Sequence, residues 1–169
     1  MAYSNFPEYS QAEIEFPDIP SKPIQVRRLR ILDDQGKPAS VLDCSKSFQM
    51  VIEVDCRETA SGTVNLFIET ADHVRVCHSI CANAIKEYTR FTKGKRLQFV
   101  ARFPGGLLNE RSYTFGAVVT PPGDLGPYDV VISPTFRLEA LTGSSPFVGE
   151  RKKRRDILRV AMDWDVMEI

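Results

Sequence analysis

The feature that most limits what this chain can fold into is a pair of alternating segments joined by a short connection. Residues 97–103 (LQFVARF) and 112–120 (SYTFGAVVT) place apolar side chains at every second position. This is the period of a β-strand with one face in a core. Pro104 and the two glycines after it end the first segment, and residues 109–112 turn the chain into the second. The sequence therefore predicts two neighbouring antiparallel strands.

Similar segments recur along the chain, with turn residues between them. They are residues 24–32, 47–55, 63–70 and 74–81, and a later run over residues 128–141 that Pro134 interrupts. Only residues 81–91 leave room for a short turn or helix, and no segment keeps a helical period over three turns. Many short strands without helices between them predict an all-β, immunoglobulin-like antiparallel β-sandwich.

The strand pattern also predicts which side chains form the core between the two sheets. These are Phe48, Met50, Ile52, Leu66, Ile68, Leu97, Phe99, Phe103, Tyr113, Phe115 and Val119. Burial of each stabilises the fold by about 1.5–3 kcal/mol, so we expect neither a metal nor a cofactor to be needed. We predict one domain over residues 24–169, preceded by a proline-rich linker or N-terminal arm over residues 1–23.

Bulk composition excludes some partners and compartments. The chain has 22 basic and 22 acidic residues among 169, so no net field draws it to nucleic acid. Its first ten residues lack the charged start and apolar run of a signal peptide, and no window reaches the ~18 apolar residues of a membrane span. We expect a cytoplasmic protein whose four cysteines are free thiols.

One cluster of histidine and cysteine residues invites a metal hypothesis. His73, Cys77, His78 and Cys81 would suit zinc if they lay on a loop. On a strand, however, residues four apart lie ~13 Å apart, and His78 faces the other way. We therefore favour ordinary strand residues and no metal, with a metal or thiol role as the alternative.

No catalytic motif is evident in the sequence. The two histidines lie five residues apart and no Gly-x-Ser-x-Gly turn occurs, so a nucleophile with its base is not indicated. The carboxylate pair Asp163 and Asp165 lies near the chain end, where solvated acids are common. We expect no catalytic residues and a binding module rather than an enzyme.

Several segments match the pattern of a known family in order and spacing. Pro104 is followed by Leu107-Leu108-Asn109 and then by Tyr113-Thr114 at the start of a strand. The further segments are residues 24–32 with the turn Asp33-Asp34-Gln35-Gly36, residues 136–138 (FRL), and residues 160–165 with Trp164. Over about residues 24–166 the chain thus resembles the C-terminal domain of Wzt, the ATPase subunit of ABC transporters that export O-antigen polysaccharide.

That resemblance implies a function and a set of partners. The family's domain recognises the non-reducing end of a finished O-antigen polysaccharide and couples glycan completion to export. It implies a homodimer, contact with the transporter membrane subunit and the ATPase domain, and a location at the inner face of the inner membrane. Nothing here matches the phosphate-binding Gly-x4-Gly-Lys-Ser/Thr pattern, since residues 92–96 lack the first glycine and the hydroxyl residue. We therefore expect a separated domain or a stand-alone relative that hydrolyses no ATP.

The resemblance also assigns a role to the end of the chain. In the family a final strand crosses to a second copy, which would make residues 157–167 a swapped C-terminal strand. The run Arg151-Lys152-Lys153-Arg154-Arg155 would be its hinge. From the residues alone, this basic run is either a solvated loop or a contact for an anion, on lipid phosphates or on an acidic partner.

Strand parity predicts a binding face as well. The residues expected to point outward are Asn65, Phe67, Glu69, Arg75, Ser79, Thr114, Val118 and Thr120. One aromatic ring among planar polar side chains and hydroxyls suits a shallow glycan-binding site, although an ordinary solvent face or a dimer contact has the same composition. The alternative function is a protein-interaction β-sandwich that docks the transporter or the glycan-synthesis machinery without binding sugar. An enzyme acting on the glycan is disfavoured because no acid/base signature occurs.

Overall fold

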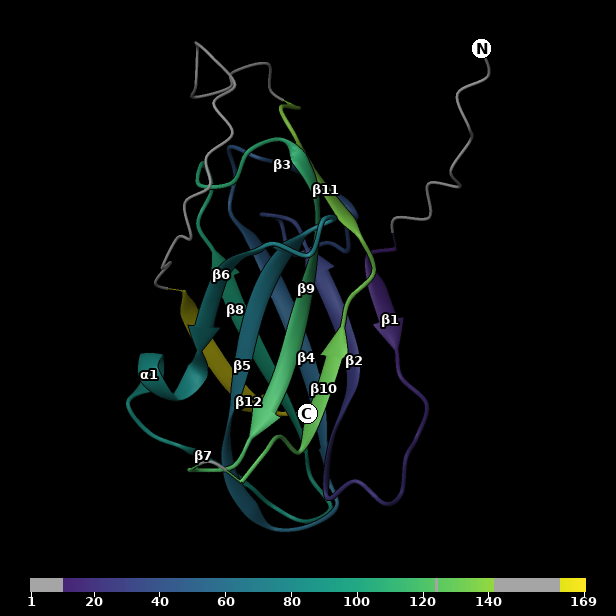
Figure 1. The fold of residues 1–169 in the computed structure, drawn as a ribbon, viewed down its shortest axis with the longest axis vertical. Helices are drawn as coiled ribbons and strands as arrows, with labels where there is room; N and C mark the ends of the chain where they lie inside the picture. The colour runs from purple at the N-terminus through teal and green to yellow at the C-terminus, as the bar shows by residue number, and fades with distance from the viewer. Residues whose placement is uncertain (1–10, 124, 142–161) are drawn as a thin grey trace.

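A computed structural model describes residues 11–123, 125–141 and 162–169, and these form two stacked β-sheets (Figure 1). The first sheet has the strand order β1 (Glu13–Glu15), β2 (Ile24–Leu32), β4 (Phe48–Cys56), β8 (Arg96–Phe103) and β12 (Asp163–Glu168). The second sheet has the order β3 (Val41–Asp43), β11 (Phe136–Glu139), β9 (Arg111–Thr120), β5 (Ala60–Thr70) and β6 (Arg75–Ile80). In addition, β10 (Asp129–Ile132) pairs with β9, and β7 (Thr89–Phe91) pairs with β5.

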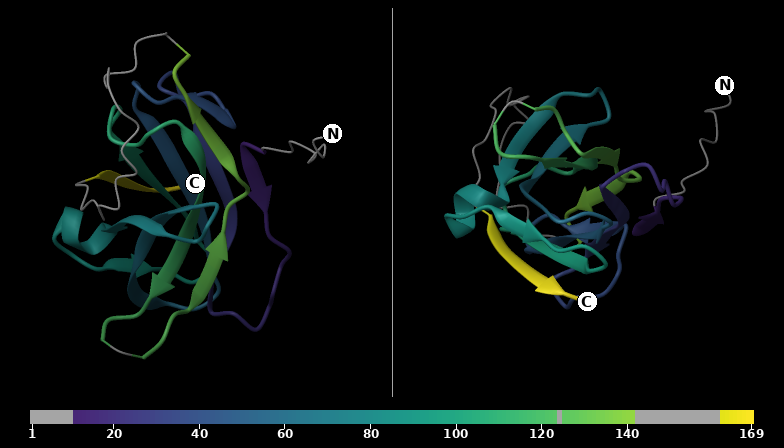
Figure 2. Two further views of the ribbon diagram at one scale, coloured as in Figure 1. Left: turned by 45° about the horizontal axis from the view of Figure 1, so that its top comes forward. Right: turned by 90° about the horizontal axis from the view of Figure 1, so that it is seen from below.

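The two layers pack face to face, as the view from below shows (Figure 2). All of the side chains predicted to form the core are buried between them. Phe48 stacks on Phe103 with ring centroids 5.0 Å apart, and Phe136 packs against Tyr113 at 6.0 Å. The predicted all-β sandwich is therefore confirmed. Strand pairing is antiparallel except between β11 and β3, which run parallel.

The predicted pairing of the two segments around residues 104–110 is wrong. Strand β8 lies between β4 and β12 in the first sheet, whereas β9 lies in the second sheet next to β5. The connection crosses between sheets and passes so close to residues 44–46 that a Cβ at Gly105 would lie 2.3 Å from the Ser45 carbonyl oxygen. Alternation places a side chain on the inner or outer face, but it does not select the neighbouring strand.

The outer edge of β9 is shared by two strands. Strand β11 pairs with Ser112 and its neighbours, and β10 pairs with the later part of β9 over residues 116–119. Pro134 separates β10 from β11, because it cannot donate to a ladder. Between the two strands, the Ser133 hydroxyl oxygen accepts a hydrogen bond of 2.9 Å from the Phe115 amide, which would otherwise lack a partner strand.

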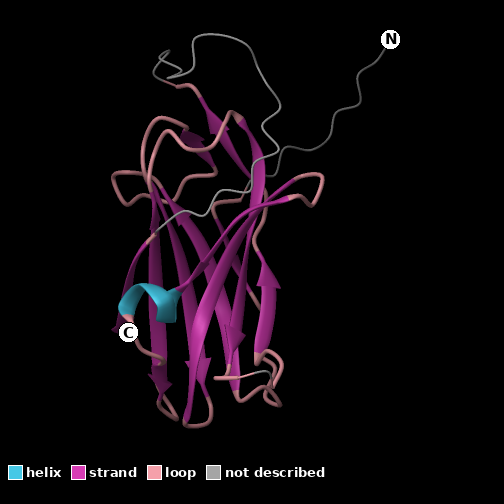
Figure 3. Ribbon diagram, turned by 60° about the vertical axis from the view of Figure 1, so that its left-hand side comes forward, coloured by secondary structure: helices cyan, strands magenta, loops and turns pink. Residues whose placement is uncertain are grey.

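The edge of β5 is divided in the same way. Strand β7 pairs with residues 60–62 and β6 with residues 65–69. Between them the chain forms the short helix α1 (Cys81–Ile85), which lies at one edge of the sandwich (Figure 3). The Ala82 amide donates a hydrogen bond of 2.9 Å to the Thr63 hydroxyl and so ties α1 to β5. The short helix expected within residues 81–91 is present, and a strand follows it.

Residues 11–23 act as an arm along the edge of β2. Within this arm β1 pairs with β2, and Lys22 forms an ion pair of 2.5 Å with Asp129 at the start of β10. The Asp129 side chain is buried and also accepts hydrogen bonds from the Val26 and Val130 amides at 2.8 and 2.9 Å. This carboxylate joins the arm, the first sheet and the second sheet.

Strand β12 closes the first sheet by pairing with β8 of the same chain, with Trp164 opposite Ala101. Exchange of this strand with a second copy stays a prediction. The basic run 151–155 and the first part of the segment predicted as a swapped strand lie outside the described residues. Among the residues that the structure does describe, no helix has the length and apolar character needed to cross a membrane.

Candidate functional site

The outer faces of the two sheets differ in how their charges are used. On the first sheet, charged side chains pair with each other across strands. Arg30 lies 2.8 Å from Glu53, and Arg102 lies 2.6 Å from Asp165. The pair of Arg102 with Asp165 is half-exposed and contributes little stability, whereas Glu53 is buried. Both pairs leave few charges free to bind a partner. The outer face of the second sheet is more mixed and is the better candidate for a site.

Phe67 lies at the centre of that second outer face, opposite Gly116 on β9 and His78 on β6. Its ring rests directly on the glycine backbone, because a Cβ at Gly116 would come within 2.0 Å of the ring. The guanidinium carbon of Arg75 lies 4.0 Å from the ring centroid on the other side. Phe67 points outward as predicted but is only 6% exposed, so its ring itself offers little open surface.

Arg75 covers Phe67 in a defined orientation. Its Nε and Nη2 atoms both donate to Glu69 Oε1, at 3.3 and 3.0 Å. The Arg75 side chain is 53% exposed, so part of the guanidinium faces solvent. Burial and the nearby charge of Arg75 lower the pKa of His78 on the same face, which favours a neutral imidazole. The centre of the face thus combines a cation above one aromatic ring with a carboxylate and an imidazole on neighbouring positions.

The remaining predicted side chains surround this centre. Thr114 lies opposite Glu69, and Val118 lies opposite Asn65. The Asn65 amide donates a hydrogen bond of 3.3 Å to the Thr120 hydroxyl, whereas its carbonyl oxygen is buried and accepts none within the described residues. The structure therefore brings all predicted site residues except Ser79 onto one face.

Ser79 points into the core, so its predicted outward orientation is wrong. Arg75 pairs with Glu69 while Cys77 pairs with Ile68, which leaves Val76 as an extra residue in β6. Such a bulge reverses the side-chain parity of the residues that follow it. The Ser79 hydroxyl oxygen instead accepts a hydrogen bond of 2.9 Å from the Trp164 indole and links the two sheets.

Strand β6 also separates the histidine and cysteine residues that were considered as a metal site. His73 lies in a turn with a φ of 58°, and His78 lies on the outer face. Cys77 and Cys81 are buried, and burial raises the pKa of each thiol to about 12. Within the described part of the chain, no three His, Cys, Asp or Glu side chains are grouped to hold a metal ion.

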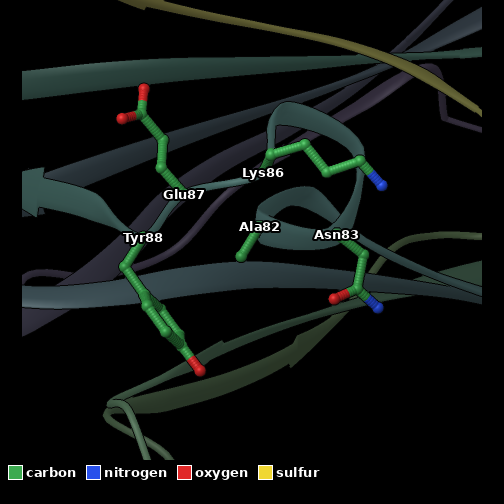
Figure 4. Close-up of a pocket in the computed structure, with 5 residues that line it drawn as sticks. All are labelled: Ala82, Asn83, Lys86, Glu87 and Tyr88. Atoms are coloured by element: carbon green, nitrogen blue, oxygen red, sulfur yellow. The ribbon is translucent and has the colours of Figure 1, made fainter.

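Two features of this region were not predicted from the sequence. The first is an apolar strip beside the face, made of Val118 with Val130 and Ile132, the last two being 51% and 49% exposed. The second is a hollow of about 350 Å³ in the connection from α1 to β7, lined by Ala82, Asn83, Lys86, Glu87 and Tyr88 (Figure 4). The one sequence signal for the hollow was Tyr88, an aromatic residue in a segment without strand periodicity.

The described residues thus form an immunoglobulin-like β-sandwich with one ion-paired and one mixed outer face. No family model and no curated protein match the sequence. Among solved structures, the fold is similar to the crystal structure of the C-terminal domain of Wzt, with a TM-score of 0.60 and 15% sequence identity. The similarity covers 79% of this chain and 80% of that one. At this identity the likeness establishes a shared fold.

Proposed function

We propose that this domain recognises the non-reducing end of an O-antigen polysaccharide without catalysing a reaction, and that occupancy couples glycan completion to export. Two findings support the proposal. The chain shares its fold with the C-terminal domain of Wzt. The outer face of the second sheet carries amide, carboxylate, guanidinium and hydroxyl groups beside an apolar strip, which suits a ligand with hydroxyls and apolar ring faces.

The observation that carries the proposal is the half-exposed Arg75, held in place by Glu69 and Phe67. A fixed guanidinium loses little freedom on binding and presents several donors in one plane. Because each exchanged hydrogen bond contributes only about 0.5–1.5 kcal/mol, a single site of this kind binds weakly, in the micromolar to millimolar range. We propose a homodimer with exchanged β12 strands, in which two sites act together to offset that weakness.

The remaining partners follow from the same proposal. They are the membrane subunit of the transporter and its ATPase domain, at the inner face of the inner membrane. A bound glycan end would bias the arrangement of this domain relative to those partners. Such coupling requires that the glycan bind one arrangement more tightly than the other.

The test is a titration of the chain with O-polysaccharide purified from the organism that encodes it, followed by NMR shifts or calorimetry. Arg75→Ala should weaken binding about 10-fold or more, since hydrogen bonds to charged groups are worth about 1.5–3 kcal/mol. Arg102→Ala is the matched control, because Arg102 is a similarly exposed arginine in an ion pair on the opposite sheet. Absence of saturable binding by the wild-type chain would contradict the proposal.

A second function is favoured by the apolar strip of Val118, Val130 and Ile132. Exposed apolar patches often mark protein contacts, so this face would suit a protein-interaction β-sandwich that docks the transporter or the glycan-synthesis machinery. Val130→Ser with Ile132→Ser separates the two functions. Loss of transporter association with unchanged polysaccharide titration would indicate docking at the strip.

A further inference from the structure

The hollow beside α1 is formed by a detour of the chain between β6 and β7. The Tyr88 ring and the Asn83 amide lie on either side of Ala82 and point toward the same side, while the Glu87 carboxylate points to the opposite side (Figure 4). A volume of about 350 Å³ is at the small end of the ligand pockets in proteins, which span roughly 300–1,000 Å³. The hollow therefore has room for one small ligand rather than for a long chain.

The polar groups of the hollow are not used by the fold. Tyr88 is 53% exposed, and neither its hydroxyl nor the Asn83 amide makes a hydrogen bond within the described residues. Elsewhere on the second sheet the polar side chains bind each other, as in the pairs Arg75 with Glu69 and Asn65 with Thr120. An exposed aromatic ring beside an unpaired amide is what a sugar ring needs for stacking and hydrogen bonding.

The backbone holds this arrangement in an unusual conformation. Lys86 ends α1 with φ 66° and ψ 18°, in the left-handed region that residues other than glycine rarely adopt. Only His73 shares a positive φ among the described residues other than glycine. Lys86 turns the chain from α1 toward β7, and Tyr88 lies across Ala82 from Asn83 (Figure 4).

The hollow lies next to the end of β5 and β9 that borders the proposed glycan face. Thr63, which accepts the Ala82 amide, pairs with Thr120 on β9, and Thr120 binds the Asn65 side chain. On the other side, Thr89 pairs with Gly62 and places Tyr88 at the same level of β5. The hollow therefore lies near one end of the proposed glycan face.

We propose that the hollow is a subsite for one pyranose residue, with the Tyr88 ring stacking on the sugar and the Asn83 amide bonding to its hydroxyls. This inference rests on the proposed function and assigns the position of a terminal sugar. It adds a binding site apart from Arg75 and Phe67.

The experiment is a titration of ¹⁵N-labelled protein with the purified O-polysaccharide and with methyl glycosides of its component sugars. Tyr88→Ala should weaken binding about 3- to 10-fold, because the stacking contact is lost. Tyr88→Phe keeps the ring and should bind nearly as the wild type, and Asn83→Ala should weaken binding about 3-fold. Tyr88 and Asn83 amide signals should shift at saturation.

Glu87→Gln is the matched control, because this side chain borders the hollow but points away from it (Figure 4). Thermal melts of all variants establish that each one folds. If Tyr88→Ala and Asn83→Ala bind like the wild type while Arg75→Ala does not, the subsite is wrong and the glycan function stands. If the wild-type chain binds neither the polysaccharide nor any methyl glycoside, the proposed function and the subsite both fail.

Discussion

The contact between Phe67 and Gly116 yields a prediction whose size can be worked out from the structure. A Cβ at Gly116 would lie 2.0, 2.5 and 2.5 Å from three atoms of the Phe67 ring, so Gly116→Ala must push the ring outward. The ring cannot move without displacing Arg75, whose guanidinium carbon lies 4.0 Å from its centroid. Overpacking of this kind costs about 1–3 kcal/mol, and we expect Gly116→Ala to lower the free energy of unfolding by about 2 kcal/mol.

Removal of the ring should cancel that cost. Phe67→Ala alone should destabilise by about 2–3 kcal/mol, near or below the lower end of the range for fully enclosed phenylalanines, because the group that covers the ring, Arg75, is itself half-exposed. In that background the new methyl group at Gly116 enters vacated space, so its cost should fall to about zero. The coupling energy of the cycle should therefore be about 2 kcal/mol, within the range for residues in contact.

Urea denaturation measures all four proteins, with the fluorescence of Trp164, the sole tryptophan of the chain, as the signal. Gly123→Ala is the control, because a Cβ there meets nothing within 4 Å although its φ of 79° makes the substitution strained. Gly123→Ala should lower the free energy of unfolding by the same amount in the wild type and in Phe67→Ala. A coupling energy below about 0.5 kcal/mol between Gly116 and Phe67 would refute the packing described here.

Three other predictions concern stability, thiol chemistry and strand exchange. Asp129→Ala should lower the free energy of unfolding by about 3 kcal/mol in urea titrations, because it leaves two amides and Lys22 without their acceptor. Lys22→Met should lower it by less, and equal losses for the two variants would contradict this account. Burial raises the pKa values of the Cys56, Cys77 and Cys81 thiols to about 11, 12 and 12, so their contribution to stability is complete below pH 9 and is lost as pH rises from there toward 12. Urea midpoints measured at pH 8 and pH 10 should show this decline. Rapid alkylation of the native protein at pH 8 would argue against burial of the thiols. Gln98→Cys with Met167→Cys places two thiols at positions that pair directly between β8 and β12. A short thiol crosslinker should yield dimers on denaturing gels if β12 is exchanged, whereas a monomeric product would exclude exchange.

Part of the site could be predicted because a strand has a period of two. Asn65 and Glu69 alternate with buried Leu66 and Ile68, so parity alone places them on the outer face. Parity failed at Ser79 because the bulge at Val76 is one extra residue with no sequence marker. It also said nothing of Tyr88, whose position depends on the detour through α1.

Exposure was harder to predict than orientation. Phe67 points outward as expected, yet Arg75 from the next strand covers it and Gly116 on the other side lets it lie flat. Whether an outward side chain is buried depends on which strands lie beside its own, and long-range pairing decides which strands those are. No local pattern in β5 contains that information.

The sequence by itself determined the long strands, the inner faces of those without a bulge and the apolar core, because alternation and turn residues act over a few neighbouring positions. Only the tertiary structure decided that β8 and β9 belong to different sheets and that β6 and β7 share one edge of β5. Those pairings join segments far apart in the chain, and they are selected by how the whole core packs. The candidate glycan face and the hollow beside it are products of that packing.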